Sequence, residues 1–217
     1  MSFDIAQTPT LQAVATADQR QLVEDLQERV DAAFQQAEQL PEVIAAAESQ
    51  AAAEERLARL RAAERALNQY AMEMGQKLAG LREASLDGII ESAGNGEKLD
   101  FKPLSELAAL ESRNRHASRA IERLVERLIP SAQLAQLREE SHALAAKARA
   151  LEQIAQDRAE KLLGQLRDAV SEEVVLPVDM SKGVSGALLA QAAELKRRAW
   201  QLSTNADTLE KTVGRQL

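Results

Sequence analysis

The stretch LARLRAAERALNQYAMEMGQKLAGL, residues 57–81, decides the fold class of this chain. Apolar side chains recur in it at alternating intervals of three and four residues. This is the a/d pattern by which α-helices pack in coiled coils. The pattern therefore predicts a long helix that packs along one side, its inner seam, against another helix. The large apolar members of this seam are Leu57, Leu60, Leu67, Met74, Leu78 and Leu81.

The composition of the whole chain favours helix over sheet. Among 217 residues there are 9 glycines and only 2% aromatic residues, while alanine, glutamate, glutamine, leucine and arginine dominate. These five residue types suit helices, whereas sheets need β-branched and aromatic side chains. We therefore predict an all-α fold, an elongated antiparallel helical hairpin or bundle with coiled-coil packing.

Proline and glycine mark where the first helices are expected to begin and end. Residues 1–10 are predicted to form a flexible tail, followed by a helix over residues 11–39. Pro41 is tolerated in the first turn of a helix but not in a helix interior, so we predict a break or kink at residues 40–41. The next helix then runs to Ala93, and residues 94–103, which begin with Gly-Asn-Gly, reverse the chain.

The second half of the chain is expected to run back along the first. Residues 11–173 together then form a long helical hairpin, with a break or kink at Pro130. Residues 174–186 contain β-branched residues, a proline and two glycines, and we predict a loop there. The third helix carries a series at alternating intervals of three and four, in which three members are polar: Leu104, Leu107, Glu111, Asn114, Ser118, Ile121, Val125 and Leu128.

The last predicted helix, residues 187–217, has the most regular heptads of the chain. Alanine and leucine alternate along its seam, and alanine lets two helices approach closely. Because the preceding loop lets this helix swing, we expect it to be the one left over for a partner. The large apolar members of its seam are Leu188, Leu195, Leu202, Leu209 and Val213.

The register of the second helix is expected to slip near Ser85, where Leu86, Ile89 and Ile90 continue the apolar series. Such a slip is a discontinuity in the supercoil.

Sequence motifs for catalysis are missing. The chain has no cysteine, no glycine-rich phosphate loop and no Gly-x-Ser-x-Gly element. Glu139 and His142 have the spacing of half a di-metal helix motif, but the other histidine, His116, lacks a glutamate three residues before it. We therefore predict that the protein is not an enzyme, with no catalytic residue, no cofactor, no metal site and no small-molecule substrate.

Charge is unevenly placed along the sequence. Residues 1–55 carry 11 acidic residues against Arg20 and Arg29, whereas the chain as a whole has a net charge of −7. An acidic front end opposes binding to nucleic acid or to an anionic membrane. The arginines at 115, 119, 123 and 127 form an i, i+4 ladder, but glutamates are interleaved with them, so we interpret it as a salt-bridged solvent face.

The closing stretch LSTNADTLEKTVGRQL, residues 202–217, resembles the end of the cytoplasmic bundles of chemotaxis receptors. The likeness is mainly one of heptad pattern, and the glutamate-rich signalling tip of those receptors is not present in this sequence. The resemblance implies a helical signalling module as one alternative function.

The predicted shape favours a structural or adaptor protein that acts through coiled-coil contacts, as a spacer, assembly subunit or docking rod. We expect its partner to be a second copy of the chain, another helical protein, or both, in the cytoplasm. Trp200 is expected to cap a bundle interface and Phe101 to plug the bundle end or form a contact tip, and both are candidate partner contacts. The alternatives are a membrane-surface or membrane-remodelling protein, a helical pore-forming toxin component and the signalling module.

Overall fold

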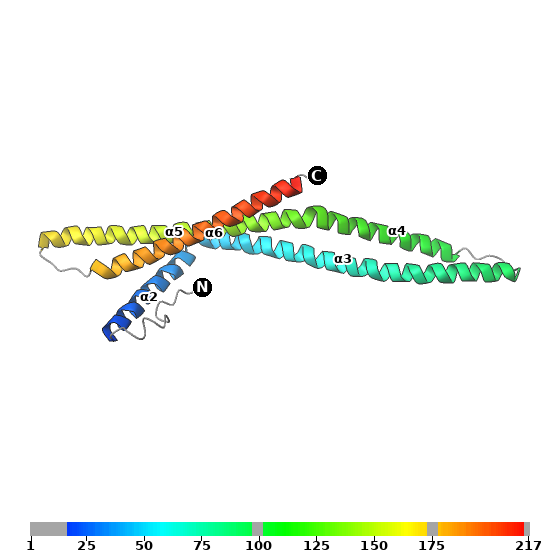
Figure 1. The fold of residues 1–217 in the computed structure, drawn as a ribbon, viewed down its shortest axis with the longest axis horizontal. Helices are drawn as coiled ribbons and strands as arrows, with labels where there is room; N and C mark the ends of the chain where they lie inside the picture. The colour runs from blue at the N-terminus through cyan, green and yellow to red at the C-terminus, as the bar shows by residue number, and fades with distance from the viewer. Residues whose placement is uncertain (1–16, 97–101, 173–177, 215–217) are drawn as a thin grey trace. The chain divides into compact units, whose positions relative to one another are not determined.

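The computed structural model describes residues 17–96, 102–172 and 178–214. All regular structure within these ranges is helical, so the predicted all-α bundle is confirmed. The predicted tail, residues 1–10, lies outside them. The elements, drawn in Figure 1, are α2 (Ala17–Glu38), α3 (Pro41–Gly94), α4 (Lys102–Arg123), the π-helix η2 (Leu124–Leu128), α5 (Ile129–Glu172) and α6 (Val178–Gly214).

The chain divides into two compact units, and each is described by itself. Unit 1 consists of residues 1–52 and 137–208, and unit 2 of residues 53–136 and 209–217. The division falls inside α3, α5 and α6, so these three helices contribute residues to both units.

In unit 1, α2 ends at Glu38 and α3 begins at Pro41, which confirms the predicted break. The backbone carbonyl of Leu40 accepts hydrogen bonds from the N–H groups of Val43 and Ile44, both at 3.0 Å. Proline suits this first helical position because its missing N–H would have no partner inside the helix.

The core of unit 1 is built from α2, the start of α3, α5 and α6. Alanine predominates in it, and Ala33, Ala37, Ala148 and Ala192 are fully buried. Small side chains let helix backbones approach closely. The larger buried members are Val30, Val43, Leu151, Ile154, Val184 and Leu188.

The predicted loop over residues 174–186 is wrong from Val178 onward, because α6 begins there. A glycine inside a helix costs about 1 kcal/mol relative to alanine, and burial of Val184 and Leu188 offsets this cost. Gly183 faces the Leu26 side chain of α2: a Cβ placed on it would lie 3.4 Å from that side chain, which is an ordinary van der Waals contact.

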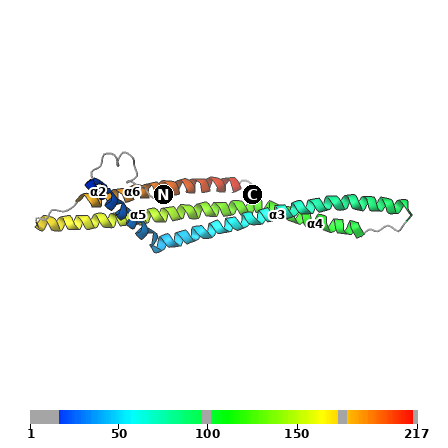
Figure 2. The ribbon, with the colours of Figure 1, turned by 90° about the horizontal axis from the view of Figure 1, so that it is seen from below.

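In unit 2, α3 packs antiparallel to α4 and to the start of α5, as Figures 1 and 2 show. Near its start, α3 contributes Leu57 to a buried cluster with Leu124, Ile129 and Ala132. Further along, Arg82 of α3 is paired with Glu111 of α4. The two contacts run in opposite directions along the sequence, which defines the antiparallel pairing. The turn after α3 includes Gly96, whose φ of 71° favours glycine.

Pro130 does not break the helix. The chain is helical from α4 through η2 into α5, and the π-helix immediately precedes the proline. The N–H of Ile129 bonds the carbonyl of Leu124, five residues back, where an α-helix would bond four residues back. A proline ring clashes with the carbonyl four residues before it in an α-helix, and the wider π turn relieves that clash.

The π-helix also changes which residues are buried. Val125 and Leu128, which the sequence placed in the seam, are each 46% exposed, whereas Leu124 and Ile129 are buried. Before the π-helix begins, Ala117 is already buried and the predicted Ser118 is exposed, which places Leu124 rather than Val125 in the seam. The π turn then inserts one extra residue, which rotates the side chains after it and buries Ile129 in place of Leu128. The predicted seam of this helix is therefore wrong at Ser118, Val125 and Leu128.

The slip predicted in α3 near Ser85 is corrected only in part. Ser85 is buried and Ile89 is half-buried, while Leu86 and Ile90 are exposed. Ser85 follows Leu81 at an interval of four and Ile89 follows Ser85 at a second interval of four, so the strict three-four register does shift here, but it passes to Ile89 alone. Two large apolar side chains are consequently left on the outside of α3.

Candidate interaction surface

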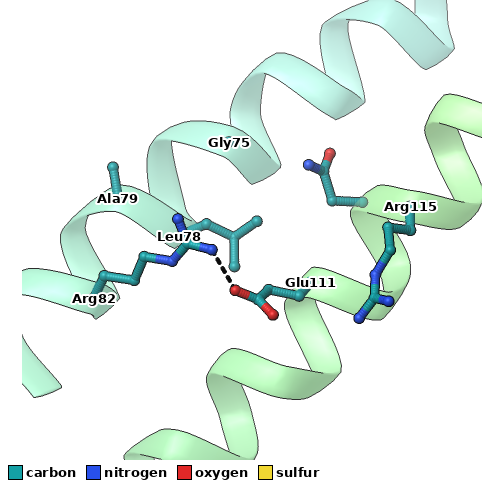
Figure 3. Close-up of a pocket in the computed structure, with 7 residues that line it drawn as sticks. Gly75, Leu78, Ala79, Arg82, Glu111 and Arg115 are labelled. Atoms are coloured by element: carbon teal, nitrogen blue, oxygen red, sulfur yellow. Dashed lines mark hydrogen bonds and ion pairs between the residues drawn. The ribbon is translucent and has the colours of Figure 1, made fainter.

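Unit 2 contains an open groove of about 430 Å³ between α3 and α4. Figure 3 shows Arg82 reaching across this groove from α3 to Glu111 on α4. The groove is lined by Gly75, Leu78, Ala79, Arg82, Glu111, Asn114 and Arg115.

The Arg82–Glu111 pair sets the electrostatics of the groove. The hydrogen bond that Arg82 donates holds the pKa of Glu111 below its ordinary value, and the charges of Arg82 and Arg115 act in the same direction. Glu111 is therefore ionised at neutral pH and serves as a fixed acceptor that links the two helices. None of the lining residues is a histidine, cysteine or serine, so the groove offers recognition groups without a nucleophile.

The structure places the predicted inner seam of α3 on the side that faces α4. Leu57, Met74 and Leu78 are buried. The remaining three large members of the seam, Leu60, Leu67 and Leu81, are half-buried.

The predicted seam of α6 is largely occupied within the chain. Leu188 is fully buried, and Leu195 packs against the core of unit 1. Substitution of these residues would therefore disturb the fold as well as any partner contact. The other members, Leu202, Leu209 and Val213, are half-buried.

Trp200 is 69% exposed, so no interface formed by the described residues covers it, and its contact with a partner stays a prediction. Its neighbour Ala199 occupies the buried position, and the Ala199 carbonyl accepts a 2.8 Å hydrogen bond from the Ser141 hydroxyl of α5. Trp200 therefore lies on the outer face of α6. Leu189, eleven residues earlier, lies on the same face of the helix and is 50% exposed. Phe101 lies outside the described residues.

A second apolar series runs along the outside of α3. Met72, Leu86 and Ile90 are 61%, 60% and 68% exposed. These residues follow the intervals of a heptad, but on the face away from the inner seam. The sequence contains this signal as a second three-four series that sequence reasoning missed. We call it the outer stripe, and it comprises residues 58, 62, 65, 69, 72, 76, 79, 83, 86 and 90, all exposed. Four members, Arg65, Gln69, Gln76 and Glu83, are polar, and Ala79 also lines the edge of the groove.

Ion pairs connect the helices of unit 1. Lys147 of α5 contacts Glu38 of α2 at 2.5 Å, and Lys196 of α6 contacts Glu152 of α5 at 2.6 Å. On α6 itself, hydrogen bonds from Arg197 and then Arg198 lower the pKa of Glu194. Charged side chains at these helix edges therefore favour one mutual arrangement of helices.

The polar candidates from the sequence do not form a metal site. His142 is exposed, and no group of three potential ligands gathers anywhere in the described ranges. All four arginines of the i, i+4 ladder are exposed, and only Arg115 lines the groove.

Within the part of the chain that the structure describes, no helix combines the length and apolar character needed to span a membrane. No protein-family model, no curated protein and no solved structure matches this chain.

Proposed function

We propose that the protein is a cytoplasmic, non-enzymatic structural or adaptor protein that acts through helix–helix contacts. One observation carries this proposal: two helices whose inner seams are occupied within the chain still expose large apolar residues on their outer faces. On α3 these are Met72, Leu86 and Ile90, and on α6 they are Leu189 and Trp200. Leu86 and Ile90 lie one helical turn apart, and adjoining exposed apolar residues mark interaction sites more often than isolated ones do.

The arrangement of these residues favours a helical partner. They recur at helical intervals on straight faces, and an amphipathic helix recognises such a face through side chains one turn apart. Burial of apolar area supplies the attraction, while charged residues at the edges select the partner and its orientation.

The size of the native assembly tests this function. We would fractionate soluble extract of the source cells by size and detect the chain, whose own mass is 23.7 kDa. Elution well above the size of the purified monomer is expected. Cells that carry Leu189→Gln and Trp200→Gln, or Met72→Gln and Leu86→Gln, should show a smaller assembly.

Leu163→Gln is the matched control, because Leu163 is an exposed leucine on α5 and belongs to neither face. Unchanged helix content, measured by circular dichroism, would show that each variant still folds. Elution as a monomer in native extract, or binding of the purified chain to anionic vesicles, would contradict the proposed function and favour the membrane-surface alternative.

A further inference from the structure

The outer stripe of α3 has the geometry of an unused coiled-coil seam. Its ten residues alternate at intervals of four and three from Ala58 to Ile90, and all are exposed. The inner seam of the same helix is covered by α4 and the start of α5. A helix with two apolar faces can bury both only if each face has a neighbour, and the described part of unit 2 covers the inner face alone.

Charges along this face are distributed by sign. The charged members of the outer stripe are Arg65 in its first half and Glu83 in its second half, and Arg61 and Asp87 flank these two halves from opposite edges; all four are exposed. Arg82, at the heptad position of Arg61, is paired with Glu111 of α4. If two copies of α3 met in parallel and in register, arginine would face arginine and carboxylate would face carboxylate. If the copies met antiparallel, each basic half would lie against an acidic half. The outer stripe is therefore complementary to itself in one orientation only.

We propose that a second copy of this chain docks antiparallel on the outer stripe, with a two-fold axis at the level of residue 74. In antiparallel heptad packing, an a position lies opposite a d position of the other helix. This register places Arg65 opposite Glu83 of the second copy and Arg61 level with Asp87 of the second copy. The inference rests on the proposed function and names its partner.

The same register also matches side-chain sizes. Leu86 lies opposite Ala62 of the second copy, and Ile90 lies opposite Ala58 of the second copy. Large residues packed against small ones let two helices interdigitate without leaving cavities. Because the contact is the same patch on both copies, it closes on itself and gives a dimer rather than an open filament.

Charge reversal followed by mixing tests this interface on the full-length chain. Variant A carries Arg61→Glu and Arg65→Glu, and variant B carries Glu83→Lys and Asp87→Lys. Sedimentation equilibrium should show self-association of each variant weakened by about tenfold or more, because attractive pairs become repulsive. An equimolar mixture of A and B should recover association, since each variant then meets opposite charges. Lys77→Glu is the control on the same helix but off the outer stripe, and it should leave association unchanged.

The orientation has an independent readout. The chain has no native cysteine, so Glu91→Cys provides a single labelling site for distance measurement by electron spin resonance. Antiparallel docking about residue 74 separates the two labels by about 50 Å, at 1.5 Å rise per residue. Parallel docking would bring them within about 20 Å, since packed helix axes lie roughly 10 Å apart.

The outcomes separate this inference from the function on which it rests. Self-association that survives in both variants, or a short label distance, overturns the antiparallel interface and leaves the adaptor function standing. A chain that stays monomeric at all concentrations also overturns the inference, and the native assembly size then decides whether a different helical partner sustains the function.

Discussion

Replacement of Leu188 by alanine tests whether the core of unit 1 is packed as described. Leu188 is fully buried, and it belongs to a cluster made largely of alanines. Removal of three buried carbons forfeits about 2.4 kcal/mol of transfer free energy, at about 0.8 kcal/mol per carbon. Alanine neighbours have no flexible side chain that could fill the space, so the cavity raises the expected cost to about 3–4 kcal/mol.

Leu189→Ala is the matched control, because it makes the same substitution one residue later on the same helix. Leu189 is half-exposed, so its truncation should cost less than about 1 kcal/mol. Urea unfolding followed by circular dichroism measures both values, and an unchanged slope shows that the free energies are comparable. Equal losses from the two variants, or a loss below about 1 kcal/mol from Leu188→Ala, would refute the packing described for α6.

Three further predictions concern other parts of the chain. In urea unfolding, Ile129→Ala should lower the free energy of unfolding by about 2–3 kcal/mol, and Leu128→Ala should lower it by less than about 1 kcal/mol. The reason is that Ile129 is buried after the π turn whereas Leu128 is half-exposed. A larger loss from Leu128→Ala would contradict the π turn and favour an uninterrupted α-helix. The Arg82–Glu111 pair contributes stability at neutral pH, because the pKa of Glu111 is lowered in the folded chain from its ordinary value of 4.5. This contribution is present above the ordinary pKa and is lost as the pH falls from 4.5 through the lowered pKa, where Glu111 becomes protonated. Glu111→Gln should therefore flatten the fall in urea midpoint over that acid range, and an unchanged slope would exclude the pair as its cause. Acrylamide should quench the fluorescence of Trp200 freely in the isolated monomer, and Trp200→Gln should change the free energy of unfolding of the monomer by less than about 0.5 kcal/mol. Strong protection of this fluorescence from quenching in the monomer would contradict the outward position of Trp200.

The sequence predicted the helices well because their signals are local and repeated. The inner seam of α3, the stop at Pro41 and the helical composition each follow from intervals or propensities that a few neighbouring residues set. The structure shields the residues of that inner seam from solvent, and α2 ends where the proline requires.

The errors occur where a contact distant in the sequence outweighs a local preference. Two glycines suggested a loop, but burial of Val184 and the approach of Leu26 to Gly183 favour a helix there. Pro130 suggested a break or a kink without deciding between them, and the structure places a π turn directly before the ring. Both features depend on contacts between helices, which the sequence pattern of one helix does not predict.

The candidate surface was only partly predictable. The inner-seam leucines were identified, but Leu86 and Ile90 were assigned to the continuation of that seam, which passes through Ile89 instead. Leu86 and Ile90 belong to the apolar pattern whichever face they occupy, and only their exposure assigns them to the outside. Trp200 was placed beside an interface by its neighbour Ala199, and one step along a helix turns a side chain by about 100°.

The discontinuous make-up of unit 1 sets an order of events during protein synthesis. Its first segment ends at residue 52, and its second begins at residue 137. The apolar face of α2, including Val30 and Ala33, leaves the ribosome long before α5 and α6, which will cover it. Residues 53–136 of unit 2 are complete earlier and can pair their helices while synthesis continues. The apolar face of the nascent α2 therefore stays uncovered by its partner helices until translation has passed α5 and α6.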